Sequence, residues 1–135
     1  MAVTFYFARH GETQFNVENR VQGWCDSPLT DSGIHDAYRL GRGLADVAFA
    51  SAYASDSSRA ERTLALALEA RENARGALSE GSAAGASVPA GCDERLREWC
   101  FGDLEGESSQ RLRRRLFDLF GEDLSREEQN RRLNE

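Results

Sequence analysis

The order of apolar and polar positions predicts alternating strands and helices over the first half of the chain. Residues 3–8 form a short apolar run rich in β-branched and aromatic side chains, which predicts a strand covered on both faces. Thr30 is a predicted N-cap, because apolar side chains then recur at helical spacing: Ile34, Ala37, Tyr38, Gly41 and Ala45. Residues 47–54 predict a second strand, and the polar cluster 55–58 caps a second helix with the apolar stripe Ala60, Leu64, Ala67 and Leu68. This order is typical of parallel βαβ construction.

The second half of the chain carries weaker signals. Residues 76–91 are rich in Gly, Ala and Ser and predict a surface loop, with a weak indication of a third strand around Val88. Residues 112–120 predict a third amphipathic helix that ends at Gly121. A capping box over residues 125–128 predicts the start of a fourth helix.

Composition narrows the class of protein. The chain has 135 residues, of which 40% are hydrophobic and 30% are charged, so we expect one globular α/β domain over residues 1–135. Its net charge of −6 argues against a general nucleic-acid binder and against a protein that adheres to anionic membranes. All 17 basic residues are Arg, which excludes a Lys Schiff base and a P-loop lysine.

The cysteines and the termini indicate the cellular compartment. Three cysteines without pairing logic argue against a disulfide framework, and no Cys or His has the spacing of a zinc site. The N-terminus lacks the basic stretch and apolar run of a signal peptide, and no apolar run approaches membrane-spanning length. We therefore expect a cytoplasmic protein with no disulfide framework, no zinc site and no membrane span.

The predicted first strand ends at Arg9 and His10, which open a Gly- and Asn-rich loop over residues 9–29. The predicted second strand ends at the polar pair 55–56, with Arg59 just beyond. In a parallel sheet both strand ends lie on the edge where α/β proteins bind ligands, so Arg59 can reach an anion that faces Arg9 and His10. Guanidinium groups suit phosphate oxygens, and His10 could act as a nucleophile, a general base or a metal ligand.

Glu98 is the candidate proton donor. Trp99 follows it directly and Phe101 lies three positions on. Aromatic surroundings raise the pKa of a carboxyl group by desolvation, which suits a proton donor near neutral pH.

Four blocks of residues carry a more specific signal. The first block is Arg9-His10-Gly11-Glu12-Thr13 with Asn16, and the second is Gly23-Trp24 with Asp26, Pro28-Leu29-Thr30 and Gly33. The third block is Ser55-Asp56 with Arg59-Ala60 and Thr63, and the fourth is Leu96-Arg97-Glu98 with Gly102 and Glu105-Gly106. Together these blocks resemble the motifs of the histidine phosphatase superfamily, the phosphoglycerate mutase-like proteins. The resemblance covers residues 3–106 and implies a three-layer αβα fold with a mostly parallel central sheet.

The resemblance also implies a phosphoryl-transfer mechanism. His10 would attack a phosphoryl group and become a phosphohistidine, while Arg9 and Arg59 would hold the equatorial oxygens. Glu98 would protonate the leaving oxygen and then take a proton from the hydrolytic water. Three further residues would lie around the phosphate: Asn16, Arg20 and Gly23. The resemblance implies a small phosphorylated substrate, and neither a metal nor an organic cofactor.

The chain departs from the family pattern toward its C-terminus. The family has a second essential His in a late His-Gly motif after another core strand, whereas the only other histidine here is His35. His35 lies within the predicted first helix, at a variable position of the family, so it does not replace the missing group. We therefore expect a fold that is incomplete at its C-terminus. The open apolar edge on residues 3–8 could then be covered by a partner chain, as in a homo-oligomer.

Three functions follow from the resemblance. The first is hydrolysis of a phosphomonoester, from a small metabolite or a phosphoprotein, through a phosphohistidine. The second is a cofactor-dependent phosphoglycerate mutase, and the third is a phosphate-binding relative with little catalysis because the second His is absent. The mutases typically read Glu-Arg-His-Tyr-Gly where this chain reads Glu98-Trp-Cys-Phe-Gly102, so the sequence favours the phosphatase.

Overall fold

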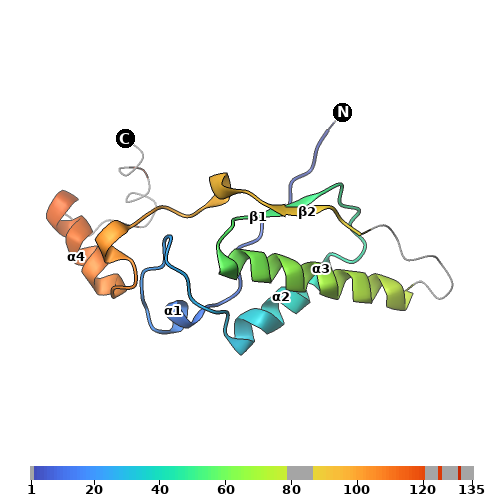
Figure 1. The fold of residues 1–135 in the computed structure, drawn as a ribbon, viewed down its shortest axis with the longest axis horizontal. Helices are drawn as coiled ribbons and strands as arrows, with labels where there is room; N and C mark the ends of the chain where they lie inside the picture. The colour runs from blue at the N-terminus through green and yellow to red at the C-terminus, as the bar shows by residue number, and fades with distance from the viewer. Residues whose placement is uncertain (1, 79–86, 121–124, 126–130, 132–135) are drawn as a thin grey trace.

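The structure, a computed structural model, describes residues 2–78, 87–120, 125 and 131. Its elements follow in the order α1 (Gln14–Val17), α2 (Asp31–Gly43), β1 (Ala52–Ala54), α3 (Ser58–Leu78), β2 (Ala90–Cys92) and α4 (Ser109–Phe120), with 3₁₀ turns at Glu94–Leu96 and Gly102–Leu104 (Figure 1). Strands β1 and β2 pair in parallel. The predicted α/β class with a parallel sheet is therefore confirmed.

The sheet and α3 form the βαβ unit that the sequence predicts. Tyr53 at the centre of β1 lies opposite Gly91 at the centre of β2, and α3 connects the two strands and packs against β1 (Figure 1). Strand β1 is shorter than the expected range 47–54, because only three of its residues have partners across the ladder. The weakly predicted third strand is β2, which begins just after Val88.

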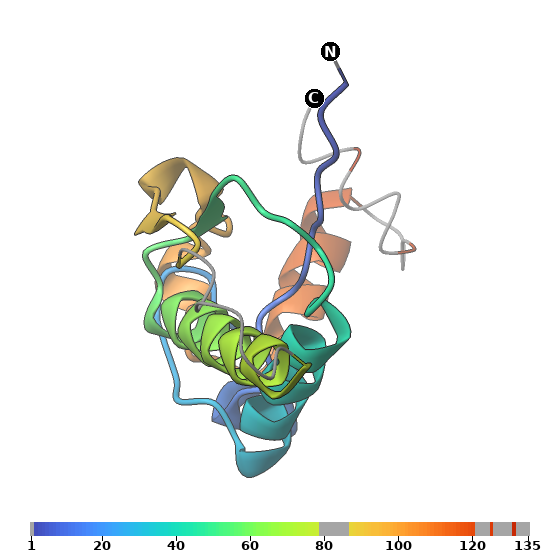
Figure 2. The same cartoon turned by 90° about the vertical axis from the view of Figure 1, so that its right-hand side faces the viewer.

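Helices α2 and α3 pack against each other through small residues (Figure 2). Thr30 caps α2 as predicted, with its Oγ1 accepting a hydrogen bond of 3.1 Å from the Gly33 amide. Gly41 lies against the carbonyl oxygen of Ala67, with no space for a Cβ between them. The buried apolar side chains of the two helices are Ala37, Leu66, Ala67 and Ala70. The core of the described chain is therefore centred on this helix pair.

The predicted strand over residues 3–8 is wrong. The segment pairs with no strand among the described residues, and Figure 2 shows it running apart from the sheet. Its large apolar side chains are exposed, and Phe7 reaches 92% exposure. A strand is stabilised by ladder hydrogen bonds from a neighbour, and β1 pairs only with β2. The segment makes aromatic contacts instead, such as the edge-to-face contact of Tyr6 with Phe49 at 5.4 Å between ring centroids.

Helix α4 begins at Ser109 rather than at Leu112, because the Ser108 hydroxyl accepts a hydrogen bond of 3.3 Å from the Arg111 amide. Leu116 is its buried apolar contact. The predicted stop at Gly121 and most of the predicted fourth helix lie outside the described residues. Among the helices that the structure describes, none combines the length and apolar character needed to cross a bilayer.

Candidate active site

The backbone that carries His10 is anchored by α2 and α3. The Gly11 amide donates a hydrogen bond of 3.0 Å to Thr63 Oγ1 on α3, and the Thr30 amide at the start of α2 donates one of 2.9 Å to the Glu12 carbonyl. A Cβ on Gly11 would collide with the backbone of the first turn of α2, so glycine permits this close approach. The backbone of residues 11–12, next to His10, is therefore fixed, although residues 3–8 pair with no described strand.

The imidazole of His10 is half-buried, and its Nδ1 lies 2.7 Å from the carbonyl oxygen of Gly11. A carbonyl oxygen only accepts hydrogen bonds, so Nδ1 carries the proton and Nε2 keeps its lone pair in the neutral ring. Burial lowers the pKa of His10, and the charges of Arg59 and Arg9 lower it further. The hydrogen bond to the Gly11 carbonyl and the charge of Asp26 raise it in part, but the pKa stays below its ordinary value. The neutral ring, which is the nucleophilic form, is therefore favoured near neutral pH.

Arg59, in the first turn of α3, is a buried cation that fixes the loop before α2. Its Nη1 donates hydrogen bonds of 3.1 Å to the Cys25 carbonyl and to Asp26 Oδ1, and its Nη2 donates one of 2.8 Å to the Gly23 carbonyl. Its Nε is buried and has no hydrogen-bond partner among the described residues. The two terminal nitrogens thus fix the loop of residues 23–26 to the first turn of α3.

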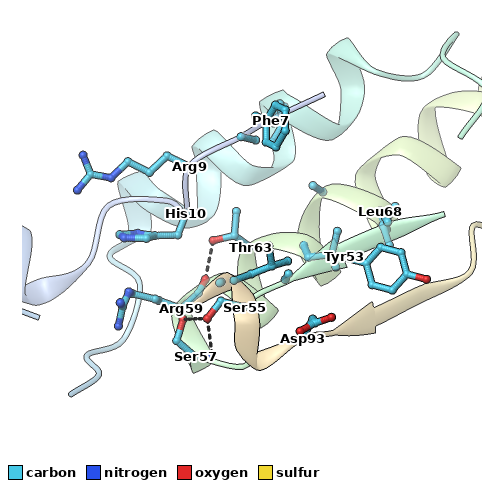
Figure 3. Close-up of a pocket in the computed structure, with 18 of the residues that line it drawn as sticks. Phe7, Arg9, His10, Tyr53, Ser55, Ser57, Arg59, Thr63, Leu68 and Asp93 are labelled. Atoms are coloured by element: carbon cyan, nitrogen blue, oxygen red, sulfur yellow. Dashed lines mark hydrogen bonds between the residues drawn. The ribbon is translucent and has the colours of Figure 1, made fainter. Parts of the chain in front are cut away.

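The four predicted catalytic residues line one open cavity of about 1210 Å³: Arg9, His10, Arg59 and Glu98. In Figure 3, His10 lies between the two arginines, and the three side chains point to the same side. Arg9 is exposed, and its guanidinium has no hydrogen bond or ion pair within the described part of the chain. One fixed and one free cation therefore flank the imidazole.

Glu98 also lines this cavity and is exposed. Its Oε1 accepts a hydrogen bond of 2.9 Å from the Trp99 amide. The side chain of Trp99 is itself 38% exposed, so the apolar enclosure that we expected around this carboxylate is absent. The segment 93–101 crosses the site without a covering element among the described residues, which explains the exposure.

Asn16 and Arg20, which we expected around the phosphate, line neither of the two cavities, and other contacts engage their polar atoms. Asn16 Oδ1 accepts hydrogen bonds of 3.0 Å from the amide and the hydroxyl of Thr13, which completes the capping box of α1. Arg20 Nε donates a hydrogen bond of 2.6 Å to the Gly106 carbonyl, and its guanidinium lies 4.0 Å from the centre of the Phe15 ring. Both residues therefore shape the loop rather than the cavity.

Gly23, the third residue expected near the phosphate, does lie beside the site. It lines a smaller cavity of about 310 Å³ that shares Arg59 and Glu98 with the larger one. Its φ is +59°, and an added Cβ would lie 2.7 Å from the ring of Phe101. The position therefore requires glycine for its backbone conformation and for the space.

Sequence reasoning gave no role to Asp26, which supplies the counter-charge of Arg59. The carboxylate accepts hydrogen bonds from the Ser58 amide and from Arg59 Nη1. Burial alone would raise the pKa of Asp26, but the hydrogen bonds from Ser58 and Arg59 and the charge of Arg59 hold it below its ordinary value. The one sequence signal that could have indicated a role for Asp26 is its place in the motif block that begins at Gly23.

Glu105 is a second carboxylate that sequence reasoning left without a role. Its Oε1 accepts hydrogen bonds from the amides of Trp24 (2.8 Å) and Phe101 (3.1 Å), and its Oε2 accepts one of 2.8 Å from the Cys25 amide. Burial alone would raise the pKa of Glu105, but these backbone hydrogen bonds hold it below its ordinary value. The carboxylate ties the loop of residues 23–25 to the segment after Glu98.

A neutral imidazole nitrogen between two cations suits an anionic electrophile, with a phosphoryl group as the simplest case. No group of three or more His, Cys, Asp or Glu residues in the described ranges could hold a metal ion. The family model of the histidine phosphatase superfamily (branch 1) matches residues 5–134. The chain belongs to the histidine phosphatase superfamily.

Both mutases and phosphatases resemble this histidine phosphatase chain. A 2,3-bisphosphoglycerate-dependent phosphoglycerate mutase 2 from Gloeobacter violaceus is 38% identical over 98 residues, which are 73% of this chain and 39% of that protein. The crystal structure of a phosphoglycerate mutase from Bacillus anthracis matches with 36% identity and a TM-score of 0.70, over 83% of this chain and 44% of that one. An α-ribazole phosphatase from Shigella flexneri matches with 32% identity and a TM-score of 0.61, over 78% of this chain and 45% of that one.

The chain therefore has the fold of this superfamily, but it spans less than half the length of these relatives. The family and the fold class implied by the four sequence blocks are confirmed. The described residues supply the part of the histidine phosphatase fold that carries His10, Arg59 and Glu98.

Proposed function

We propose that this histidine phosphatase chain carries the nucleophilic part of a phosphomonoester hydrolase site. The observation that supports it most directly is the hydrogen bond between His10 Nδ1 and the Gly11 carbonyl. This bond leaves Nε2 unprotonated at a cavity that also holds Arg59. The proposed substrate is a small phosphorylated metabolite or a phosphoprotein.

The proposed reaction has two displacements. In the first, His10 Nε2 forms a bond to phosphorus, the bond from phosphorus to the leaving oxygen breaks, and Glu98 gives its proton to that oxygen. In the second, a water molecule loses a proton to Glu98 and forms the new P–O bond, while the P–N bond breaks. The products are an alcohol and inorganic phosphate, and both His10 and Glu98 return to their starting protonation states.

The two arginines contribute in different ways. Arg59 supplies a buried charge at a fixed position on the wall of the cavity, so it stabilises the charge on the transferring group without reorganisation. Arg9 is exposed and unpaired among the described residues, so its guanidinium is free to close on phosphate oxygens when a ligand arrives.

The compartment proposed for this reaction is the cytoplasm. All three cysteines of the chain are unpaired thiols: Cys25, Cys92 and Cys100. Free thiols are typical of proteins in reducing compartments.

Phosphoglycerate mutase activity is the second candidate. It is favoured by the names of relatives such as the Gloeobacter violaceus protein. In a mutase the phosphohistidine returns its phosphoryl group to a bound hydroxyl compound rather than to water. A phosphate-binding protein with little catalysis is the third candidate, because the chain has no histidine besides His10 and His35.

The test uses a phosphoester labelled in the phosphoryl group and the full chain. We expect acid-labile, base-stable label on the protein after rapid quenching, and loss of that label in His10→Ala. His35→Ala is the matched control, because His35 is exposed on α2 and should label as the wild type does. Label that persists in His10→Ala would exclude His10 as the nucleophile.

The fate of the label separates the three candidates. Release as inorganic phosphate supports the hydrolase, and transfer to added 3-phosphoglycerate supports the mutase. Saturable binding of inorganic phosphate with neither labelling nor release supports the binding protein.

A further inference from the structure

We infer that Trp24 is a positioning residue for Glu98. The indole of Trp24 holds the backbone segment that carries Glu98 at the site. Trp24 Nε1 donates a hydrogen bond of 2.8 Å to the carbonyl oxygen of Glu98. Both residues line the smaller cavity beside Arg59. The inference rests on the proposed function, in which Glu98 is the general acid.

The backbone around Trp24 is held by hydrogen bonds with two charged side chains. Glu105 accepts hydrogen bonds of 2.8 Å from the amides of Trp24 and Cys25, and Arg59 donates one of 2.8 Å to the carbonyl of Gly23. Three consecutive residues of the loop are thus held by the same two charged side chains. The ring of Trp24 therefore projects from a rigid part of the loop although it is 55% exposed.

The residue before Glu98 is held by the same ring. The guanidinium of Arg97 lies 5.1 Å from the centre of the Trp24 ring, within the range of a cation–π contact. Arg97 also forms a bidentate ion pair with Asp56, in which Nε lies 2.7 Å from Oδ1. Trp24 therefore contacts both residues 97 and 98, and Asp56 fixes the first of them to the end of β1.

Glu98 depends on these contacts because its side chain has little support of its own. The carboxylate is exposed and accepts a hydrogen bond only from the adjacent Trp99 amide within the described residues. Its distance from a leaving oxygen is then set by the backbone of residues 97–98. Loss of the indole donor would let this segment drift from the site and would weaken proton donation.

Trp99 provides a matched control. It is next to Glu98, and no hydrogen bond of its indole occurs among the described residues. The variants Trp24→Phe and Trp99→Phe remove the same N–H group and leave a ring of the same kind. Only the first removes a bond to the Glu98 segment.

The first measurement reports the contact without requiring activity. The two tryptophans give two indole N–H signals in a ¹H–¹⁵N spectrum of the full chain, which the two Phe variants assign. We expect the indole N–H of Trp24 to exchange with solvent at least about ten-fold more slowly than that of Trp99, because it is hydrogen-bonded. Equal exchange rates, or slower exchange at Trp99, would overturn the contact.

The second measurement compares p-nitrophenyl phosphate, whose leaving group needs little protonation, with benzyl phosphate, whose leaving group needs a general acid. We expect Trp24→Phe to lower kcat/KM for benzyl phosphate about 3- to 10-fold and to leave the value for the nitrophenyl ester within about two-fold. Trp99→Phe should change neither, and Glu98→Gln should lower the benzyl value by about 10²–10⁴.

An equal loss on both esters in Trp24→Phe, or no loss on either, would overturn the positioning role. If the wild-type chain hydrolyses neither ester, the proposed function fails. The exchange measurement then still decides whether Trp24 holds the Glu98 segment.

Discussion

Arg59 Nη1 lies 3.1 Å from Asp26 Oδ1, in an ion pair that joins the first turn of α3 to the loop before α2. The Arg59 side chain is 4% exposed and that of Asp26 is 27% exposed. Removing one partner of such a pair leaves the other charge buried and uncompensated, which destabilises the fold more than the pair itself stabilises it. Asp26 is therefore the point at which the site and the stability of the chain are most directly coupled.

We expect Asp26→Asn to lower the free energy of unfolding at pH 7 by about 2–3 kcal/mol, because Arg59 loses its counter-charge and the Ser58 amide loses a charged acceptor. Urea denaturation followed by circular dichroism measures this. Asp36→Asn is the control, because Asp36 forms an exposed pair with Arg39 at 3.8 Å and should change stability by less than about 0.5 kcal/mol. Equal effects of the two substitutions would contradict the assignment.

The same pair predicts a pH dependence of stability. The pKa of Asp26 lies below its ordinary value of 3.8, so the carboxylate stabilises the folded chain above that pH. This contribution is lost as the pH falls through the lower pKa of the folded state. The stability difference between the wild type and Asp26→Asn should therefore shrink below pH 3.8, and a difference that stays constant there would exclude the ionised pair as its cause.

Arg9→Gln should move the acid limb of the kcat/KM profile to higher pH. Burial and the charges of Arg59 and Arg9 hold the pKa of His10 below 6.5, so the wild-type limb should lie below that pH. Removing the charge of Arg9 raises the pKa of His10. The imidazole then stays protonated, and so inactive as a nucleophile, up to a higher pH than in the wild type. Arg42→Gln, an exposed change at the end of α2, should leave the limb in place.

Gly41→Ala should lower the free energy of unfolding by about 1–3 kcal/mol. The added methyl group would meet the Ala67 carbonyl and force α2 and α3 apart. Gly43→Ala is the matched control, because nothing lies within 4 Å of a Cβ at Gly43. This control should be neutral or stabilising by about 0.4–1 kcal/mol, because alanine reduces the entropy of the unfolded chain. Thermal denaturation compares the two, and a stable Gly41→Ala protein would contradict the close helix contact.

Thr63→Val should reduce both stability and phosphoryl transfer. Thr63 Oγ1 accepts the hydrogen bond of the Gly11 amide and donates one of 2.7 Å to the Arg59 carbonyl. Valine leaves the Gly11 amide without its partner, at a cost of about 1–3 kcal/mol in unfolding free energy. Displacement of His10 should lower the labelling rate about 10²-fold. Thr63→Ser keeps the oxygen and should retain most of both properties, whereas equal loss in Val and Ser would point to packing instead.

The helices were predictable because their signals are local. Thr30 and the apolar residues after it specify α2 within a few turns, and the polar cluster 55–58 does the same for the start of α3. The run over residues 3–8 shows the limit of such patterns. Its composition favours an extended chain, but a strand exists only with a partner, and the pattern holds no information about which residues lie beside it.

The candidate site was predicted in part for the same reason. The motif blocks indicate that Arg9, His10, Arg59 and Glu98 share a site, and the four residues line one cavity. A shared edge of two neighbouring strands does not explain this arrangement, because residues 3–8 pair with no described strand. Asp26 and Glu105 were missed because their partners are remote in the chain: Asp26 is 33 residues from Arg59, and Glu105 is 81 residues from Trp24. Arg20 donates a hydrogen bond to the carbonyl of Gly106, 86 residues away, and no local sequence pattern indicates that contact.

The two tryptophans of this chain both lie beside Glu98, and neither is in the helical core. Fluorescence excited selectively at tryptophan is therefore an optical report on the site, whereas far-ultraviolet circular dichroism reports mainly on α2 and α3. If the loop of residues 23–26 opens before the helix pair melts, the emission will change at a lower urea concentration than the dichroism. Any ligand that stacks on Trp24 or displaces Arg97 from it will shift the emission of the unmodified protein, so binding can be followed without a label.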